Sequence, residues 1–272
     1  MTDDADVRIV ADELTKSFAP AGRGGTALAV LGGVSFTVRA GEFVTVIGPS
    51  GCGKSTVFNM LAGLESPDSG SVRCHADDAA DTGAHCAYMP QKDLLFPWRS
   101  VLDNTVLGLQ VQGVPKAEAR RRARALFPAF GLAGFEDARP AQLSGGMRQR
   151  AALLRTVVQE REPLLLDEPF GALDSLTRTE MQSWLQEVWQ RYRWTVLMIT
   201  HDIREAVYLS DRVLVLSARP ATVRHELHVD LPRPRDLSLI TTPEFAALEA
   251  ELLEILHEES RRALAQQRMP GS

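Results

Sequence analysis

The chain has 272 residues, 44% hydrophobic and 24% charged, which is enough to bury the core of one globular domain with a small appended part. Its formal net charge of −5 leaves no basic surplus to neutralise phosphates, which excludes nucleic acid as a main partner. Three cysteines and no apolar run of about 18 residues predict a cytoplasmic protein that neither spans a membrane nor is secreted.

The first elements alternate between strands and a helix. Residues 34–38 alternate apolar and polar side chains and residues 43–47 form a denser apolar run, so each predicts a strand. Residues 54–64 predict a helix, and a turn cluster at residues 66–70 returns the chain to another short strand. The polar stretch 75–83 predicts the tip of a surface hairpin.

The middle of the chain is helical in pattern. Between residues 91 and 161 the apolar residues follow helical spacing. Residues 116–130 combine an arginine-rich face with Leu126, Phe127 and Phe130 on the other side. This region therefore predicts a helical subdomain.

Three later apolar runs predict the centre of the fold. Residues 163–167, 195–200 and 213–216 are nearly continuous in apolar side chains, which is typical of parallel strands covered on both faces. After the proline-broken stretch 231–236, residues 243–268 predict a helix that docks one apolar face on the main body. The core is expected to be α/β, and the lack of an internal repeat indicates a single unit.

The segment GPSGCGKST at residues 48–56 fits the phosphate-loop pattern between a strand and a helix. Its glycines let backbone N–H groups converge on phosphate oxygens, Lys54 supplies a positive charge, and Ser55 offers an oxygen to Mg²⁺. A chance match would occur in roughly 1% of chains this long. The predicted nucleotide-binding residues are Gly48, Pro49, Ser50, Gly51, Cys52, Gly53, Lys54, Ser55 and Thr56.

Two carboxylates and a histidine follow predicted strands. Asp167 is expected to bind Mg²⁺, and Glu168 to act as the general base toward the attacking water. His201 comes directly after the strand at residues 195–200, where its imidazole can reach a γ-phosphate. The alternatives are an acidic pair that merely begins a loop and a histidine that is structural.

The segment LSGGMRQR at residues 143–150 resembles the signature sequence of ATP-binding-cassette (ABC) ATPases. The residues Ser144, Gly145 and Gly146 open a helix, so their free N–H groups form a second anion site. The resemblance implies the fold of a P-loop NTPase ABC cassette, with a RecA-like core, an antiparallel β subdomain and an α-helical signature subdomain. It also implies ATP and Mg²⁺ as cofactors.

The resemblance assigns further roles. In this family the signature of one protomer closes on the ATP of the other in a head-to-tail dimer. Gln91 corresponds to the catalytic and Mg²⁺-sensing loop that couples to membrane subunits, and Asp174 to the loop that communicates across the dimer. Phe18 resembles the aromatic residue that stacks on adenine, although an ordinary buried aromatic is an equal alternative.

The resemblance extends from about residue 10 to residue 235. It predicts an ABC ATPase domain at residues 1–240, with the helical subdomain inserted at about residues 92–160. The remaining residues, 241–272, are expected to form a C-terminal helical extension.

The stretches DLLFPW, EPFGALD and LPRPR resemble cassettes of importers for nitrate, taurine, alkanesulfonates and thiamine-precursor pyrimidines. Within this group, YMPQKDLL and AALLRT look closer to the hydroxymethylpyrimidine type. The implied partners are a second ATPase subunit, multi-span permease subunits and a solute-binding protein, at the cytoplasmic face of the inner membrane. The solute itself is not encoded here, because its contacts belong to those partners.

Phe96, Pro97 and Trp98 form a candidate groove for a permease helix, with core packing of Trp98 as the alternative. A soluble cassette acting in DNA repair or translation is a competing function, but two cassettes or a long coiled-coil insertion are absent. An ATP-holding module without turnover is disfavoured because Glu168 and His201 fill both hydrolytic positions.

The cysteines suggest two further kinds of chemistry, metal binding and a reactive thiolate. Cys74, His75, His85 and Cys86 include metal-ligand types, but neighbours on a strand point to opposite faces, so no metal site is expected. Cys52 is expected to favour the thiolate, because it lies near Lys54 at a helix N-terminus.

Overall fold

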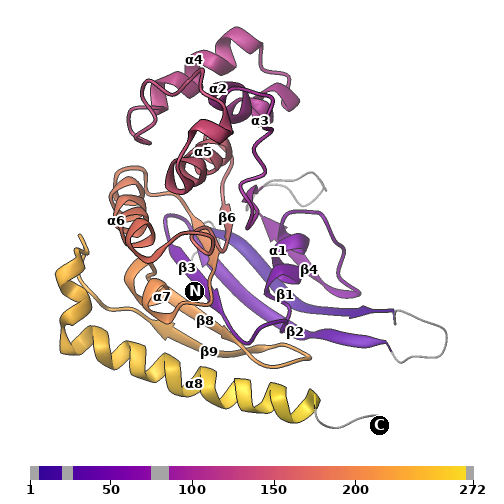
Figure 1. Cartoon of the computed structure of the whole chain (residues 1–272). Coiled ribbons are helices and arrows are strands. Elements are labelled where there is room, and N and C mark those ends of the chain that lie inside the picture. The colour runs from indigo at the N-terminus through magenta and orange to yellow at the C-terminus, as the bar shows by residue number, and fades with distance from the viewer. Residues whose placement is uncertain (1–5, 20–26, 75–85, 268–272) are drawn as a thin grey trace.

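The computed structural model describes residues 6–19, 27–74 and 86–267, and places them in two sheets with helices around them (Figure 1). In this part of the chain, the larger sheet has the order β5-β6-β7-β3-β8-β9 and the smaller one the order β2-β1-β4. The predicted hairpin tip at residues 75–83 lies outside the described residues.

The larger sheet is parallel except at one edge. Its parallel strands are β3 (Phe43–Ile47), β5 (Ala87–Met89), β6 (Leu164–Asp167), β7 (Val196–Ile199) and β8 (Arg212–Leu216). The edge strand β9 (Val223–His228) runs antiparallel to β8. Every residue of β3, β6, β7 and β8 is buried, which confirms the prediction of strands covered on both faces.

The smaller sheet is antiparallel and consists of β1 (Val7–Phe18), β2 (Leu28–Arg39) and β4 (Ser69–Cys74). The strand predicted at residues 34–38 is the second half of β2, whereas β1 was not predicted. Register shifts interrupt the pairing of β1 with β2, and Glu13 has a positive φ of 48°. These irregularities break the period-2 pattern by which a strand is recognised in a sequence.

Helix α1 (Lys54–Leu61) follows β3 and ends three residues before its predicted end, with Gly63 in the left-handed region at φ 71°. The helical part comprises α2 (Val101–Thr105), α3 (Leu107–Val111), α4 (Lys116–Leu126), a 3₁₀ turn (Pro140–Gln142) and α5 (Gly145–Val157). These helices gather beyond one end of the larger sheet (Figure 1). The expected helix at residues 116–130 is confirmed as far as Leu126.

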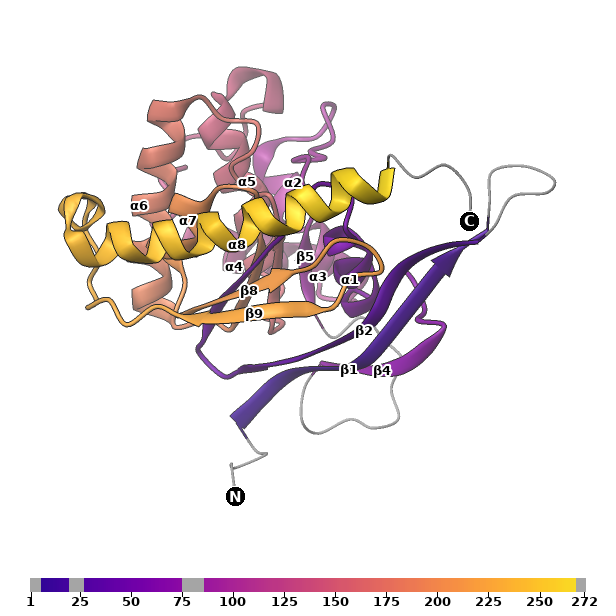
Figure 2. The same cartoon turned by 90° about the horizontal axis from the view of Figure 1, so that it is seen from below.

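The last helices are α6 (Ser175–Tyr192), α7 (Ile203–Leu209), a 3₁₀ turn (Leu237–Thr241) and α8 (Pro243–Gln267). Helix α8 runs along β8 and β9 (Figure 2), with Phe245 and Leu252 fully buried. The predicted docking of its apolar face is therefore confirmed. Within the described ranges, no helix is long and apolar enough to cross a membrane.

Two hydrophobic clusters lie on opposite faces of β3. Phe43 and Ile47 belong to one cluster, and Val44 and Val46 to the other. Arg212 of β8, only 6% exposed, pairs with Glu42 (2.8 Å) and Glu226 (2.7 Å), and it joins the two sheets by donating a hydrogen bond to the Thr37 carbonyl oxygen of β2. This buried cation is satisfied on both sides, so the larger sheet, the edge strand and the turn before β3 are held as one body.

Glu205, on the first turn of α7, is 3% exposed and accepts hydrogen bonds from Thr200 and, at 3.1 Å, from the Gln182 amide. Burial raises the pKa of its carboxyl from 4.5 to about 7. Because the folded pKa exceeds the unfolded one, protonated Glu205 favours the folded state at low pH. That contribution is lost as the pH rises toward 7.

The free energy of unfolding of Glu205→Gln, measured relative to that of the wild type, should therefore rise by about 2 kcal/mol from pH 5 to pH 8. The amide keeps the shape, its oxygen can accept from Gln182 and its NH₂ group can donate to the Thr200 hydroxyl, but it does not ionise. Urea unfolding at both pH values measures the difference, with the exposed Glu254→Gln as a control. An unchanged difference between Glu205→Gln and the wild type would show that Glu205 does not titrate in this range.

Candidate functional site

The predicted phosphate loop connects β3 to the N-terminus of α1. The Lys54 ammonium donates hydrogen bonds to the carbonyl oxygens of Gly48 (2.8 Å) and Pro49 (3.0 Å), so it is drawn across the loop. Gly51 and Gly53 have positive φ angles of 73° and 121°. A Cβ at Gly48 would lie 2.8 Å from the Leu216 carbonyl oxygen, so the loop also packs too closely for a side chain there.

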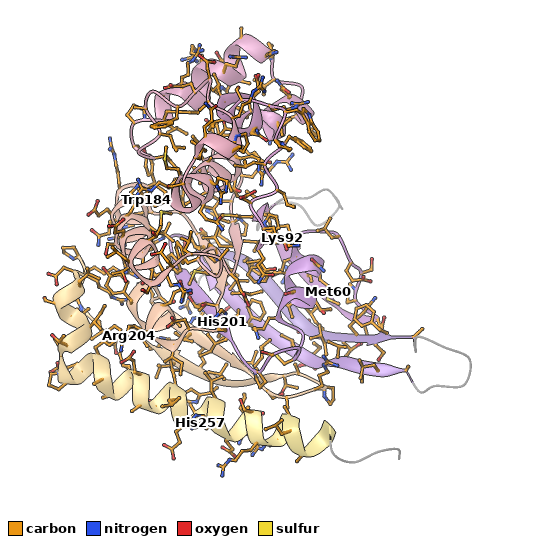
Figure 3. The ribbon with its side chains drawn as sticks, viewed as in Figure 1. Met60, Lys92, Trp184, His201, Arg204 and His257 are labelled. Atoms are coloured by element: carbon orange, nitrogen blue, oxygen red, sulfur yellow. The ribbon has the colours of Figure 1, made fainter. Side chains whose placement is uncertain are left out.

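One cavity of about 740 Å³ extends over this loop. Its lining combines the apolar side chains of Phe18, Leu28 and Val30 with residues of the loop. Glu168 and His201 line it as well, and Figure 3 marks His201. An apolar wall next to a cationic, N–H-rich loop suits a nucleotide with its base and phosphates respectively. Phe18 is 39% exposed on this wall, so the alternative of an ordinary buried aromatic is wrong.

Three predicted catalytic residues meet at one oxygen atom. The Gln91 amide donates to Glu168 Oε2 at 2.8 Å, and His201 Nδ1 lies 3.5 Å from the same oxygen. Glu168 itself has a positive φ of 44°, which is uncommon for a residue with a side chain. The strand β6 thus ends in a turn that holds this carboxylate toward both partners.

Asp167 ends β6 and is 7% exposed. Burial raises the pKa of its carboxyl, while hydrogen bonds from Tyr88, at 3.3 Å, and from Ser55 oppose that shift. Burial also raises the pKa of Tyr88 to about 12, so the phenol stays a donor. Tyr88 was missed in the sequence, because its role depends on β5 pairing beside β6.

A buried carboxylate next to the Ser55 hydroxyl fits a hard divalent cation such as Mg²⁺, which prefers oxygen ligands. Asp167 and Ser55 are therefore brought together as predicted. Gln91 contacts Glu168 and not this pair. Among the described residues, no contact of Gln91 with Ser55 or Asp167 supports its predicted role as a metal ligand.

The predicted signature residues do not line the cavity. Ser144 caps α5 by accepting a hydrogen bond from the Met147 N–H at 3.2 Å, and a Cβ at Gly146 would lie 2.9 Å from Thr177. Asp174 caps α6 through the Thr177 N–H at 3.0 Å, which holds the pKa of its carboxyl below the ordinary value. Ser144 and Asp174 are exposed and lie outside the lining of the chain's own cavity.

The three cysteines of the chain are all buried. Cys52 is 2% exposed, and burial raises the pKa of its thiol in spite of nearby Lys54, so the predicted thiolate is wrong. The Sγ atoms of Cys74 and Cys86 lie 2.7 Å apart in the interior. The two histidines considered with them, His75 and His85, lie outside the described residues.

A groove of about 540 Å³ runs between the cavity and the helical part. Its lining includes Gln91, Leu94 and Gln149, together with Lys92, which Figure 3 marks at this junction. Next to the groove, Phe96 and Trp98 stack with ring centroids 5.1 Å apart. Trp98 is 69% exposed, so the alternative that it packs in the core is wrong.

Comparison with known proteins gives consistent matches. A family model described as ABC transporter matches residues 31–171. A formylaminopyrimidine import ATP-binding protein of Halalkalibacterium halodurans is 44% identical over 84% of this chain and 90% of its own. A nitrate import ATP-binding protein of Synechocystis is 39% identical over 86% of this chain and 90% of its own.

Among solved structures, a similar one is an ATP-binding cassette in a dimeric post-hydrolysis state with ADP and phosphate. It has a TM-score of 0.68 and 27% identity, over 82% of this chain and 100% of its own.

Proposed function

The chain belongs to the ABC transporter family, and we propose that it is the ATP-hydrolysing subunit of an importer for a small solute. The observation that carries the proposal is the single cavity in which Lys54, Glu168 and His201 line one site. The predicted P-loop cassette fold agrees with the solved ABC cassette. We assign residues 1–240 to the ATPase domain, with the helical insertion at about 92–160, and residues 241–272 to a C-terminal extension.

In this proposal the loop residues 48–56 hold the phosphates of ATP, and Phe18 stacks on the adenine. Ser55 and Asp167 would hold Mg²⁺, which would neutralise charge on the phosphates when bound. Glu168 accepts a proton from the attacking water, since its carboxylate lines the cavity. Gln91 and His201 orient that carboxylate through their contacts with Oε2.

A complete site requires a second copy of the chain. Ser144, Gly145 and Gly146 lie away from the cavity of their own chain, and their free N–H groups suit a phosphate. We therefore propose a head-to-tail homodimer in which each signature closes on the partner's ATP. Asp174, exposed at the start of α6, then lies near the dimer interface.

The partners of this subunit follow from the exposed groove. Phe96 and Trp98 beside it provide an aromatic anchor for a helix of a permease subunit, close to the Gln91 that contacts Glu168. We propose that the dimer sits at the cytoplasmic face of the membrane and serves a permease with a solute-binding protein. The candidate solutes are those that the relatives import, from nitrate to thiamine-precursor pyrimidines.

Glu168→Gln should keep ATP bound and stabilise the closed dimer, while turnover falls by at least about a hundredfold. The amide preserves the shape and the contact with Gln91 but cannot accept the proton. ATPase rate and gel filtration with ATP measure the two effects. Rapid hydrolysis by this variant would contradict the role of Glu168.

Trp98→Ala should reduce recovery of permease subunits from native membranes by about tenfold. An aromatic residue that becomes buried in an interface contributes a large share of the binding free energy. Leu64→Ala, which removes a 67% exposed residue at another place, is the matched control. Affinity capture followed by mass spectrometry measures the recovery of permease subunits with each variant, and an ATPase assay of the same fraction measures turnover. Recovery of only soluble partners by the wild type would favour a soluble, non-transport ABC ATPase instead.

A further inference from the structure

Arg219 lies in the turn between β8 and β9 and packs against the phosphate loop. Its Nε donates a hydrogen bond to the Gly51 carbonyl oxygen. A Cβ placed on Gly51 would lie only 2.7 Å from Arg219 Nη2. The guanidinium therefore rests directly on the loop that is proposed to hold the phosphates.

The charge of Arg219 is not neutralised within the described chain. No described carboxylate forms an ion pair with it, and no described acceptor takes a hydrogen bond from its Nη atoms. Arg219 nevertheless lines the nucleotide cavity together with Lys54 and Ser55. A guanidinium with free donors beside a phosphate loop is suited to bind a phosphate oxygen.

The turn that carries Arg219 is fixed from two sides. The Ala218 N–H donates to Glu259 Oε2 at 3.0 Å, and Glu259, on α8, is 1% exposed. On the other side, the Ala221 N–H donates to the Val30 carbonyl oxygen at 2.8 Å. Arg219 is therefore held in place before any ligand binds, which lowers the entropy cost of a contact.

Helix α8 also reaches the back of the phosphate loop. A second cavity, of about 290 Å³, is lined by Pro49, Cys52, Arg219 and Ala263 of α8. On the outer face of the same helix, His257 points away from the body (Figure 3). The inner face of α8 thus supports Arg219 through Glu259 and approaches the loop through Ala263.

We propose that Arg219 is a further nucleotide-binding residue, which adds a second cation beside Lys54 for the phosphates of ATP. Glu259 acts through it as a positioning residue, so α8 is part of the support of the ATP site. This inference rests on the proposed function, since it takes the cavity to be the ATP site. Arg219 contributes to binding, and the proton transfer remains with Glu168.

The test is an equilibrium titration of the full chain with ATP in EDTA, which prevents turnover. Arg219→Ala should weaken ATP binding by about tenfold, the loss expected for one charge-assisted contact. Adenosine, which has no phosphates, should bind both proteins equally. Arg219→Lys should recover part of the affinity, because the charge returns without the planar fork.

Arg224→Ala is the matched control, because Arg224 also contacts Glu259, at 3.5 Å, but does not line the cavity. It should bind ATP like the wild type. Lys54→Ala should lose most of its ATP affinity. If it does and Arg219→Ala binds ATP like the wild type, the inference is overturned while the function stands. If Lys54→Ala changes nothing, the proposed site itself is wrong.

The positioning role of Glu259 is tested by a double-mutant cycle. Glu259→Leu keeps most of the buried volume but removes the acceptor of the Ala218 N–H, so it should weaken ATP binding severalfold in the wild-type background. In the Arg219→Ala background the same change should have almost no effect, since Glu259 acts through Arg219. Equal losses in both backgrounds would refute the positioning role.

Discussion

The whole candidate site depends on the parallel pairing of β3, β6 and β7. Because these strands point the same way, their carboxyl ends meet at one edge of the sheet. The phosphate loop follows β3, Asp167 ends β6 with Glu168 directly after it, and His201 follows β7. Residues far apart in the sequence are therefore brought within hydrogen-bonding range by the backbone pairing alone. The fully buried strands keep that edge rigid, which fixes the distances between these groups.

The same geometry leaves the site incomplete. In the proposed function, the sheet edge supplies the phosphate contacts, the cation site and the base, whereas the second anion site lies at the start of α5 in the helical part. The groove with Gln91 and Leu94 lies between the two parts, beside the stacked Phe96 and Trp98. Gln91 contacts Glu168 directly, so movement of a partner in this groove can change the position of the base. This is how hydrolysis and the membrane partner can be coupled.

Much of this arrangement could be predicted from the sequence, because its elements have strong local patterns. The apolar runs predicted the buried strands, and the glycines together with Lys54 predicted the phosphate loop. Arg219 and Tyr88 could not be predicted, since each acts from a turn or strand whose neighbour is set only by the fold. The expected thiolate of Cys52 failed for a related reason: proximity to Lys54 was visible in the sequence, and burial was not. Strand β9 was missed because only Val223 and Leu227 among its residues are apolar, which leaves no clear alternation of apolar and polar side chains.

The central claim is that two chains together build each ATP site, and mixing two inactive variants tests it most directly. Lys54→Ala lacks the phosphate contact, and Ser144→Arg blocks the signature. If the dimer is head-to-tail, an equimolar mixture should regain up to about a quarter of the wild-type ATPase rate, because half of the dimers carry one intact site. A mixture as inactive as its components, or full activity of Ser144→Arg alone, would contradict the account.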